Sequence, residues 1–314
     1  MHIYIEVGYI SGEQMEPEYK VMINGELVEW KDATIHVTTH ALHYGSGVFE
    51  GIRGYWDGSA IQIFRLEDHV ERILKNASIL RLDTSFDLLR EIVELLRVNN
   101  FHEDAYIRPL IYFGPGGVGI NPAGHPTHHL VFAIPFGRYL DVEKGISVCI
   151  SPWKRITDTC IPPRGKISGG YINSVLAKQD AVKNGYDEAI LLNQQGYVCE
   201  GTGENLFIIR DGRLITPPVY ADILEGITRA SIIEMAQEDG YEVLERNVYP
   251  TELYIADEVF LCGTAAEITP VVSVDHHLIG DGGTGRITKQ LADHLSSIAR
   301  GKDTRYKRWL TSVG

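Results

Sequence analysis

The stretch 161-IPPRGKISGGYINSVLAKQDAVKNG-185 places one lysine, Lys166, between an Arg-Gly pair and a Gly-Gly pair, directly before a run with helical spacing. Prolines upstream stiffen the backbone, and glycines downstream allow another group to approach it closely. A lysine becomes a nucleophile when its surroundings lower its pKa or when it forms a Schiff base. The stretch therefore predicts a reactive amine, with a solvated lysine on a strand-to-helix loop as the alternative.

The segments that flank this loop are predicted to be strands and helices in irregular order. The helix after Lys166 is expected to bury Ile172, Val175, Leu176 and Val182 and to end at Gly185. Its neighbours are a strand at 146–153, a hairpin-rich stretch at 187–218 with an Asp211-Gly212 turn, a helix at 227–240, strands at 241–249 and 258–264, and a last helix at 286–300.

The part of the chain before residue 138 is predicted to contain strands and two helices. Asn24-Gly25, between two apolar runs, is the strongest short signal for a hairpin. The first helix, 66–82, should bury Val70, Ile73, Leu74 and Ala77. The second, 85–100, should bury Phe86, Leu89, Val93 and Leu96, with Thr84 and Asp87 spaced like a capping box. Strands follow at 105–113 and 128–136, joined by the Gly/Pro-rich loop 114–127.

The pattern restarts after residue 138, which predicts two domains. We expect a small N-terminal domain at 1–139, a linker at 140–146 and a larger domain at 147–314 that carries Lys166. Because strands and helices mix without regular βαβ alternation, the predicted fold class is α+β, with two mixed-sheet domains flanked by helices.

Composition narrows the possible partners and location. A net charge of −13 without a basic run argues against nucleic acid and anionic membrane surfaces. The first 20 residues show no signal peptide, and no apolar stretch is long enough to span a membrane. The four cysteines are widely spaced, which fits a reducing compartment, so a cytoplasmic protein is expected.

Three further stretches carry groups that could share a site with Lys166. In 197-YVCEGTGENLF-207, Glu200 ends an apolar strand, so its carboxylate should point inward and need a positive partner; capping of its own loop is the alternative. In 224-LEGITRASIIEM-235, Gly226, Ile227 and Thr228 open a helix that could seat a phosphate, although ordinary capping by Thr228 explains the same letters. In 260-FLCGTAAEITP-270, small residues follow a strand and could approach an anion or form a simple turn. Together these groups match the needs of pyridoxal phosphate.

Six blocks carry a resemblance to a known family: HALHYGSGVFEGIR, AYIRPL, PPRGKISGGY, CEGTGENLF, LEGITR and CGTAAEITPV. In order and separation they resemble the class IV (fold type IV) pyridoxal-phosphate aminotransferases, and most closely the branched-chain amino-acid aminotransferases. The resemblance runs from about residue 20 to about residue 290. It implies a D-amino-acid aminotransferase-like fold with a barrel-like core. The implied reaction is transfer of the amino group of leucine, isoleucine or valine to 2-oxoglutarate, giving branched 2-oxo acids and L-glutamate by a ping-pong cycle.

The resemblance also implies roles for individual residues. Lys166 would form the internal aldimine and move the proton, Glu200 would pair with the pyridine nitrogen, and Tyr171 would bond the phenolic oxygen. Phosphate contacts would come from Arg72, Ile227, Thr228 and Thr264, with Arg65 as the rival of Arg72. Substrate would meet Thr264 and Ala265, beside Tyr106 and Arg108, with Phe49 and Tyr139 as pocket walls. Tyr44 and Ile120 would come from the other subunit, which makes a homodimer the minimum unit. Many relatives have tryptophan where this chain has Phe136, with Arg138 close by, which leaves the pocket width open.

Other interpretations remain. The same fold could serve transamination of D-amino acids or (R)-amines, a lyase that releases pyruvate without an acceptor, or a binding module without activity. His36, His40 and His43 lack the carboxylates or further ligands of a metal site, so no metal is expected. The stretch 280-GDGGTGRITK-289 resembles a phosphate-binding P-loop but has Arg-Ile where that loop needs Lys and Ser or Thr.

Overall fold

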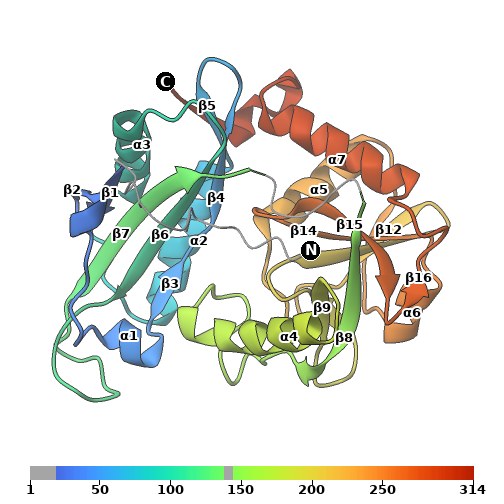
Figure 1. Cartoon of the computed structure of the whole chain (residues 1–314), viewed down its shortest axis with the longest axis horizontal. Helices are drawn as coiled ribbons and strands as arrows, with labels where there is room; N and C mark the ends of the chain where they lie inside the picture. The colour runs from blue at the N-terminus through green and yellow to red at the C-terminus, as the bar shows by residue number, and fades with distance from the viewer. Residues whose placement is uncertain (1–18, 138–143) are drawn as a thin grey trace, which may run out of the picture. The chain divides into compact units, whose positions relative to one another are not determined.

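The computed structural model describes residues 19–137 and 144–314 (Figure 1). Residues 1–18, where no signal peptide is expected, lie outside this range, as do Arg138 and Tyr139. The described chain divides into two compact units. One contains the described part of 1–139 together with Ala299–Gly314, and the other contains the described part of 140–298. The domain limits expected from the sequence stay a prediction.

The described residues of the first unit form an eight-stranded antiparallel sheet. Its order is β17-β5-β4-β6-β7-β1-β2, and β3 pairs with β6. The strands are β1 Lys20–Ile23, β2 Glu26–Glu29, β3 Gly47–Phe49, β4 Ile52–Trp56, β5 Ile61–Phe64, β6 Ala105–Phe113, β7 Thr127–Pro135 and β17 Leu310–Val313. The helices are α1 His40–Tyr44, α2 Leu66–Ile79 and α3 Leu88–Asn99, with 3-10 turns η1 Trp30–Asp32 and η3 Thr304–Trp309.

Two local predictions in this unit are confirmed. Asn24 and Gly25 join β1 to β2 with φ angles of 50° and 82°, the left-handed pair that a tight hairpin requires. Helix α2 buries Val70, Ile73 and Ala77, as its 3.6-residue period indicated, whereas Leu74, also expected to be buried, is only half-buried.

The expected start and buried face of α3 were wrong. The helix begins at Leu88, and its N-cap is Asp87 in place of Thr84, since the Asp87 side chain accepts from the amide of Arg90. Of the residues expected on the buried face, Leu96 is buried, but the rest of the buried face consists of Leu88, Glu91, Ile92 and Leu95. Phe86 lies before the helix and stacks on His129 with ring centroids 3.8 Å apart.

The end of the chain returns to the first unit, which the sequence analysis did not predict. Strand β17 pairs antiparallel with β5, with Leu310 opposite Phe64 and Val313 opposite Ile61. The amide of Arg65 donates to the carbonyl of Trp309 at 2.6 Å, and the Arg65 guanidinium lies 4.9 Å from the Trp309 ring centroid. The last strand therefore closes one edge of a sheet built from residues at the start of the chain.

The described residues of the second unit form a nine-stranded mixed sheet (Figure 1). Its order is β10-β9-β8-β15-β14-β11-β12-β13, and β16 pairs with β15. The parallel pairs are β8 with β9, β8 with β15 and β12 with β13. The strands are β8 Ile146–Lys154, β9 Glu188–Leu192, β10 Val198–Glu200, β11 Asn205–Arg210, β12 Arg213–Thr216, β13 Val243–Glu245, β14 Glu258–Gly263, β15 Glu267–Val274 and β16 His277–Leu278. The helical segments are η2 Ser168–Gly170, α4 Tyr171–Lys183, α5 Ile227–Glu238, α6 Pro250–Tyr254 and α7 Arg286–Ala299.

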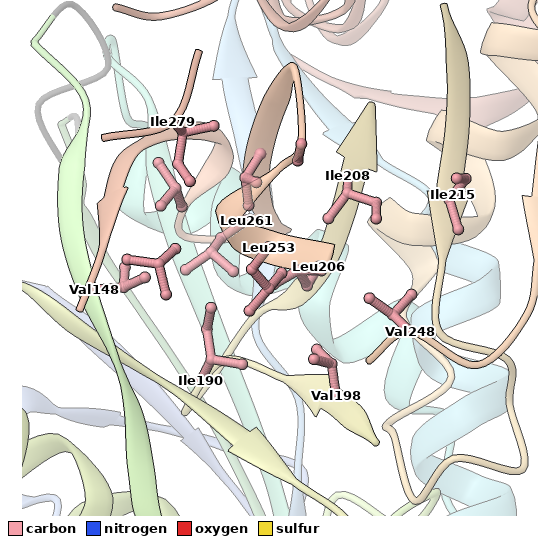
Figure 2. Packing of buried hydrophobic residues seen from close by; sticks show 14 of the residues in the cluster. Val148, Ile190, Val198, Leu206, Ile208, Ile215, Val248, Leu253, Leu261 and Ile279 are labelled. Carbon is pink, nitrogen blue, oxygen red and sulfur yellow. The ribbon is translucent and has the colours of Figure 1, made fainter. Parts of the chain in front are cut away.

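The core of this unit is an aliphatic cluster that spans the sheet. Figure 2 shows Val148, Ile190, Leu206 and Leu261, which come from β8, β9, β11 and β14, gathered in it. Burying one such side chain contributes about 1.5–3 kcal/mol, so the cluster holds the strand ends that carry polar groups in place.

Helix α4 buries a different face from the one expected. Ile172 and Val175 are 62% and 44% exposed, whereas Ser174, Ala177 and Ala181 are buried. Ala177 and Ala181 pack against strand β9, and such small side chains let the helix approach the strands closely. The prediction was wrong because it took the largest apolar residues as the buried face. The close packing anchors the helix that begins directly after the Lys166 loop.

Candidate active site

Lys166 lies on a short, internally hydrogen-bonded loop before α4. The amide of Gly165 donates to the carbonyl of Pro162 at 3.0 Å, and that of Ile167 donates to the carbonyl of Gly165 at 2.8 Å. The half-buried Lys166 side chain donates from Nζ to the hydroxyl of Tyr171 at 2.8 Å. The predicted pair of amine and phenol is thus assembled by the first residue of α4.

Glu200 ends β10 and points inward, as the strand pattern predicted. It is 4% exposed and accepts from Nη2 of Arg155 at 2.8 Å through Oε1. Its Oε2 accepts from Nδ2 of Asn205 at 2.9 Å and from the amide of Leu224 at 3.0 Å. The local capping considered as the alternative for Glu200 is made by Glu204, whose Oε2 accepts from the amide of Gly203 in the same loop at 3.0 Å.

The electrostatics of Glu200 combine burial with nearby positive charge. Burial raises the pKa of this carboxyl, while the Arg155 charge, the Leu224 amide and the charge of Lys166 oppose the rise. The Lys166 amine is therefore one of the positive charges that act on the Glu200 carboxylate.

Asn205 connects Glu200 to the start of α5. Its Nδ2 also donates to the carbonyl of Leu224 at 2.9 Å, and it lies opposite Cys262 in the pairing of β11 with β14. A Cβ on Gly226 would lie 1.9 Å from the Asn205 Oδ1, so this position accepts only glycine while Asn205 stays in place. The steric requirement explains the glycine before α5 without any need for a positive φ, which is −69° here.

Two backbone segments near this network are suited to an anion. Helix α5 has Gly226 at its N-cap, which places Thr228 inside the first turn and excludes it as the N-cap residue. The first-turn amides of a helix carry partial positive charge, and no acidic side chain occupies this turn. The second segment is the turn at Thr264 and Ala265 after β14, which directly follows the pairing of Cys262 with Asn205.

These groups fit the chemistry of pyridoxal phosphate. The cofactor needs an amine for its aldehyde, a donor for its phenolic oxygen, an anion for its ring nitrogen and an amide-lined seat for its phosphate. Within the second unit, Lys166, Tyr171, Glu200 and the α5 start with Ile227 and Thr228 supply one group of each kind.

The predicted substrate residues of the first unit share one face of its sheet. Tyr106 lies opposite Arg53, and Phe49 lies opposite Leu110. The Arg108 guanidinium lies 4.8 Å from the Phe49 centroid and 5.1 Å from that of Tyr106, and its Nη2 donates to the Tyr106 hydroxyl at 2.7 Å.

Phe136, the residue expected to bear on the pocket width, is tightly packed. Phe136 is buried, with its centroid 5.0 Å from that of Tyr106 and 5.2 Å from the Arg53 guanidinium. The Phe136 ring therefore fills the space beside Tyr106. The neighbouring Arg138 and Tyr139 lie outside the described residues, so the predicted role of Tyr139 stays a prediction.

The two candidate phosphate arginines have different partners within the first unit. Arg72 donates from Nε and Nη2 to Glu50 at 2.6 and 2.8 Å, and His69 shares the same carboxylate at 2.8 Å. Arg65 instead bonds Asp68 from Nε at 2.6 Å. Glu50 thus holds the Arg72 fork in one orientation.

Two predicted partner-facing residues and three histidines also lie in the first unit. Tyr44 is 44% exposed and Ile120 is 81% exposed. His40 is buried and bonds the Ser46 hydroxyl at 2.6 Å, which is the contact of a packed core histidine. Among the described residues, no group of three His, Cys, Asp or Glu side chains is placed to hold a metal.

Sequence reasoning missed three side chains that organise these sites: Arg155, Asn205 and Glu50. Asn205 and Glu50 lie inside the blocks that resemble the family, but the local sequence does not indicate which distant residues they contact. Arg155 lies between those blocks, and the only available signal was an arginine at the end of an apolar strand.

Comparison with known proteins defines the class to which this fold and site belong. The family model for class IV aminotransferases matches residues 47–274, so the chain belongs to the class IV aminotransferase family. A probable branched-chain-amino-acid aminotransferase of Aquifex aeolicus is 46% identical over 92% of this chain and 95% of its own length.

Two solved structures show the same similarity in three dimensions. A branched-chain aminotransferase from Thermoproteus uzoniensis with norvaline has a TM-score of 0.91 and 43% identity, covering 94% of this chain and 99% of that one. A T.th. branched-chain amino acid aminotransferase complexed with N-(5′-phosphopyridoxyl)-L-glutamate has a TM-score of 0.90 and 42% identity, covering 94% and 98%.

These matches confirm the predicted two-domain fold type IV architecture and the aminotransferase class. Class IV aminotransferases use pyridoxal phosphate, so the cofactor prediction is confirmed as well, and their substrates are amino and oxo acids. Across residues 19–137 and 144–314, no helix has the length and apolar character to cross a bilayer.

Proposed function

We propose that this protein transfers the amino group of L-leucine, L-isoleucine or L-valine to 2-oxoglutarate, forming the branched 2-oxo acids and L-glutamate. The observation that carries the proposal is the arrangement of Lys166, Tyr171 and Glu200. In a class IV aminotransferase chain, an amine bonded to a phenol, and a buried carboxylate on which the charge of that amine acts, support one shared site.

Lys166 has two tasks in this proposal. When bound, pyridoxal phosphate supplies an aldehyde that condenses with amines and a ring that accepts the electron pair of the reacting carbon. The Lys166 amine would hold the cofactor covalently between turnovers. Once substrate has displaced it, the amine would remove the proton from the substrate Cα and return it to the neighbouring cofactor carbon. A half-buried, flexible amine beside the Tyr171 hydroxyl is suited to both tasks.

The other residues of the second unit would bind and orient the cofactor. Glu200 would place its negative charge at the ring nitrogen, and Tyr171 would donate to the phenolic oxygen. The α5 amides at Ile227 and Thr228, with Thr264, would bind the phosphate. The role of Arg72 as a further phosphate contact rests on the family resemblance.

The side chains around Arg108 suit the two classes of substrate. Phe49 and Tyr106 offer apolar surface to a branched side chain. Arg108 is a cation whose buried Nε has no hydrogen-bond partner among the described residues, so it can receive the second carboxylate of glutamate. The ligands of the two similar structures, norvaline and a glutamate adduct, are of these two kinds.

The proposed enzyme is a homodimer in the cytoplasm. Tyr44 and Ile120 are exposed in the single chain, as expected for residues that complete the site of a second copy. Ala265, after β14, would present its amide to the substrate α-carboxylate.

A donor panel with a lysine variant tests this function. Purified protein with pyridoxal phosphate and 2-oxoglutarate should turn over L-leucine faster than D-alanine or an (R)-aryl amine. Lys166→Ala should lower this activity by at least about a thousandfold, because one group serves two steps. The same variant should still bind the cofactor, measured by its absorbance after gel filtration. The exposed Lys154→Ala should behave like the wild type.

Three outcomes would contradict the proposal. Undiminished activity in Lys166→Ala would remove the assigned amine. A preference for D-alanine or the (R)-amine would move the protein to another transaminase of this fold. Release of pyruvate from aminodeoxychorismate without an acceptor would make it a lyase.

A further inference from the structure

Arg155 directly follows β8 and is held there by its backbone. Its amide donates to the carbonyl of Leu192 at 2.9 Å, and its carbonyl accepts from Nε2 of Gln194 at 3.3 Å. The side chain is 8% exposed, and Nη2 lies 2.8 Å from Oε1 of Glu200, whose side chain is 6% exposed. The pair is therefore almost completely removed from water.

Arg155 differs in kind from the other donors to Glu200. Asn205 and the Leu224 amide are neutral, so they orient the carboxylate without balancing its charge. Lys166 is a second cation in reach, but its bonding changes during the proposed reaction. A guanidinium stays protonated throughout. Arg155 is thus the permanent positive charge beside Glu200.

The pair is not explained by stability alone. Taking two charges out of water costs free energy that their attraction only partly returns, so a buried ion pair is a poor way to stabilise a fold. The Nε of Arg155 is also buried without a hydrogen-bond partner among the described residues. Asp222, in the turn before α5, is a further charged group on which Arg155 acts. Because burying the Arg155 charge costs free energy, we infer that this arginine has a functional role at Glu200.

We propose that Arg155 is a positioning residue that keeps Glu200 a carboxylate aimed at the ring nitrogen of the cofactor, through the Nη2–Oε1 contact. This inference rests on the role proposed above for Glu200. A protonated Glu200 would be a neutral acid and would no longer hold a proton on the ring nitrogen. Arg155 itself touches neither cofactor nor substrate in this proposal and acts only through Glu200.

The test compares two ligands that differ only at the ring nitrogen. Apo protein is titrated calorimetrically with pyridoxal phosphate and with its 1-deaza analogue, in which C–H replaces the nitrogen. The wild type should prefer pyridoxal phosphate by at least about tenfold, because a charge-assisted contact is lost with the analogue. Arg155→Met should abolish most of this preference while changing the affinity for the analogue less than about threefold. In a Glu200→Gln background, Arg155→Met should change the ratio no further.

The control variants separate positioning from folding. Arg213→Met breaks an exposed pair with Glu242 in the same unit and should leave the preference intact. Arg155→Lys keeps the charge and should restore most of the preference. If Arg155→Met does not fold, Arg155→Gln, which also lacks the charge, takes its place.

The ratio of the two affinities distinguishes a positioning role of Arg155 from a structural one. Equal weakening of both ligands by Arg155→Met, or an unchanged ratio, would make Arg155 a purely structural residue. A preference that survives Glu200→Gln, or no preference in the wild type, would remove the proposed role of Glu200 and this inference with it. Loss of the preference in both Glu200→Gln and Arg155→Met, with rescue by Arg155→Lys, is the expected result.

Discussion

The stretches 48-VFEG-51 and 198-VCEG-201 share a short pattern in which a glutamate follows apolar residues at a strand end and precedes a glycine. Both glutamates are buried and both pair with an arginine. Their electrostatic states nevertheless differ, and the difference lies in the partners that distant parts of the chain provide.

Glu50 is surrounded by positive charge. Burial alone would raise the pKa of this carboxyl, but the charge of Arg72 and the hydrogen bond and charge of His69 together hold it well below its usual value. Both carboxylate oxygens accept from the Arg72 fork. The folded state therefore favours the anion, which orients Arg72 firmly.

Glu200 has a single contact with Arg155 and two neutral donors. Burial is the dominant influence and raises the pKa of the carboxyl. One sequence pattern can therefore give two kinds of carboxylate. In Glu50 the Arg72 fork and His69 supply charged partners to both oxygens, whereas Glu200 has one charged contact and can accept a further positive partner. A site for a protonated ring nitrogen requires a carboxylate that can accept such a partner.

The largest expected effect is the loss of stability on neutralising Glu50. Glu50→Gln leaves the Arg72 charge without its anion and should lower the free energy of unfolding by about 3–5 kcal/mol. Glu200→Gln should cost less, about 1–3 kcal/mol, because the amide oxygen can still accept from Asn205 and from the Leu224 amide, and the charge of Asp222 still acts on Arg155. Urea unfolding of both variants at pH 7.5 without added cofactor measures the two losses. Equal losses of unfolding free energy in the two variants would contradict the proposed difference between Glu50 and Glu200.

The second expected effect is an opposite dependence of stability on pH in the two regions. The pKa of Glu50 is lowered in the fold, so its contribution is present above the unfolded value near 4.5 and lost as pH falls. Glu204, in the loop after Glu200, has its pKa raised to about 8 by burial and by Glu188, against the opposing charge of Lys178. The contribution of Glu204 to the free energy of unfolding is therefore present below pH 4.5 and lost as the pH rises to about 8.

Two glutamine variants measure this pH dependence. The stability gap between wild type and Glu50→Gln should narrow below pH 4.5, whereas Glu204→Gln should flatten the loss of stability between pH 4.5 and 8. Urea unfolding from pH 2.5 to 9 follows both slopes. Slopes of the same sign for the two glutamates would contradict the assignment.

The smallest expected effect concerns the glycine after each glutamate. A Cβ on Gly51 would lie 2.1 Å from the Tyr106 hydroxyl, which Arg108 holds, whereas a Cβ on Gly201 would lie 2.8 Å from the end of the Glu204 side chain. Gly51→Ala should therefore cost about 2 kcal/mol through overpacking, and Gly201→Ala about 1 kcal/mol. Thermal unfolding of both variants makes the comparison. A larger loss for Gly201→Ala would show that the Glu204 loop is the more rigid of the two.

Much of the local structure was predictable because it depends on neighbouring residues. Asn24-Gly25 and Asp211-Gly212 both form hairpin turns with positive φ, as their types require. The faces of α3 and α4 were not predictable, because periodicity identifies an apolar stripe but not the surface that receives it. On α4 the sheet receives Ala177 and Ala181, and the larger Ile172 stays exposed.

The candidate site divides in the same way. Lys166, Tyr171 and Glu200 could be proposed from the sequence, because loop, helix start and strand end already restrict where such groups can lie. Arg155 and Asn205 could not, since no local pattern shows which carboxylate a distant arginine or amide will meet.

By itself, the sequence determined the family, the reactive stretches and most strand and helix positions, because turns, periodicity and motif spacing are properties of nearby residues. Only the tertiary structure decided that Arg155 meets Glu200, that Arg72 and His69 share Glu50, and that β17 pairs with β5. These contacts join residues that are distant along the chain. They form because packing the whole fold buries charges and strand edges that must then find partners.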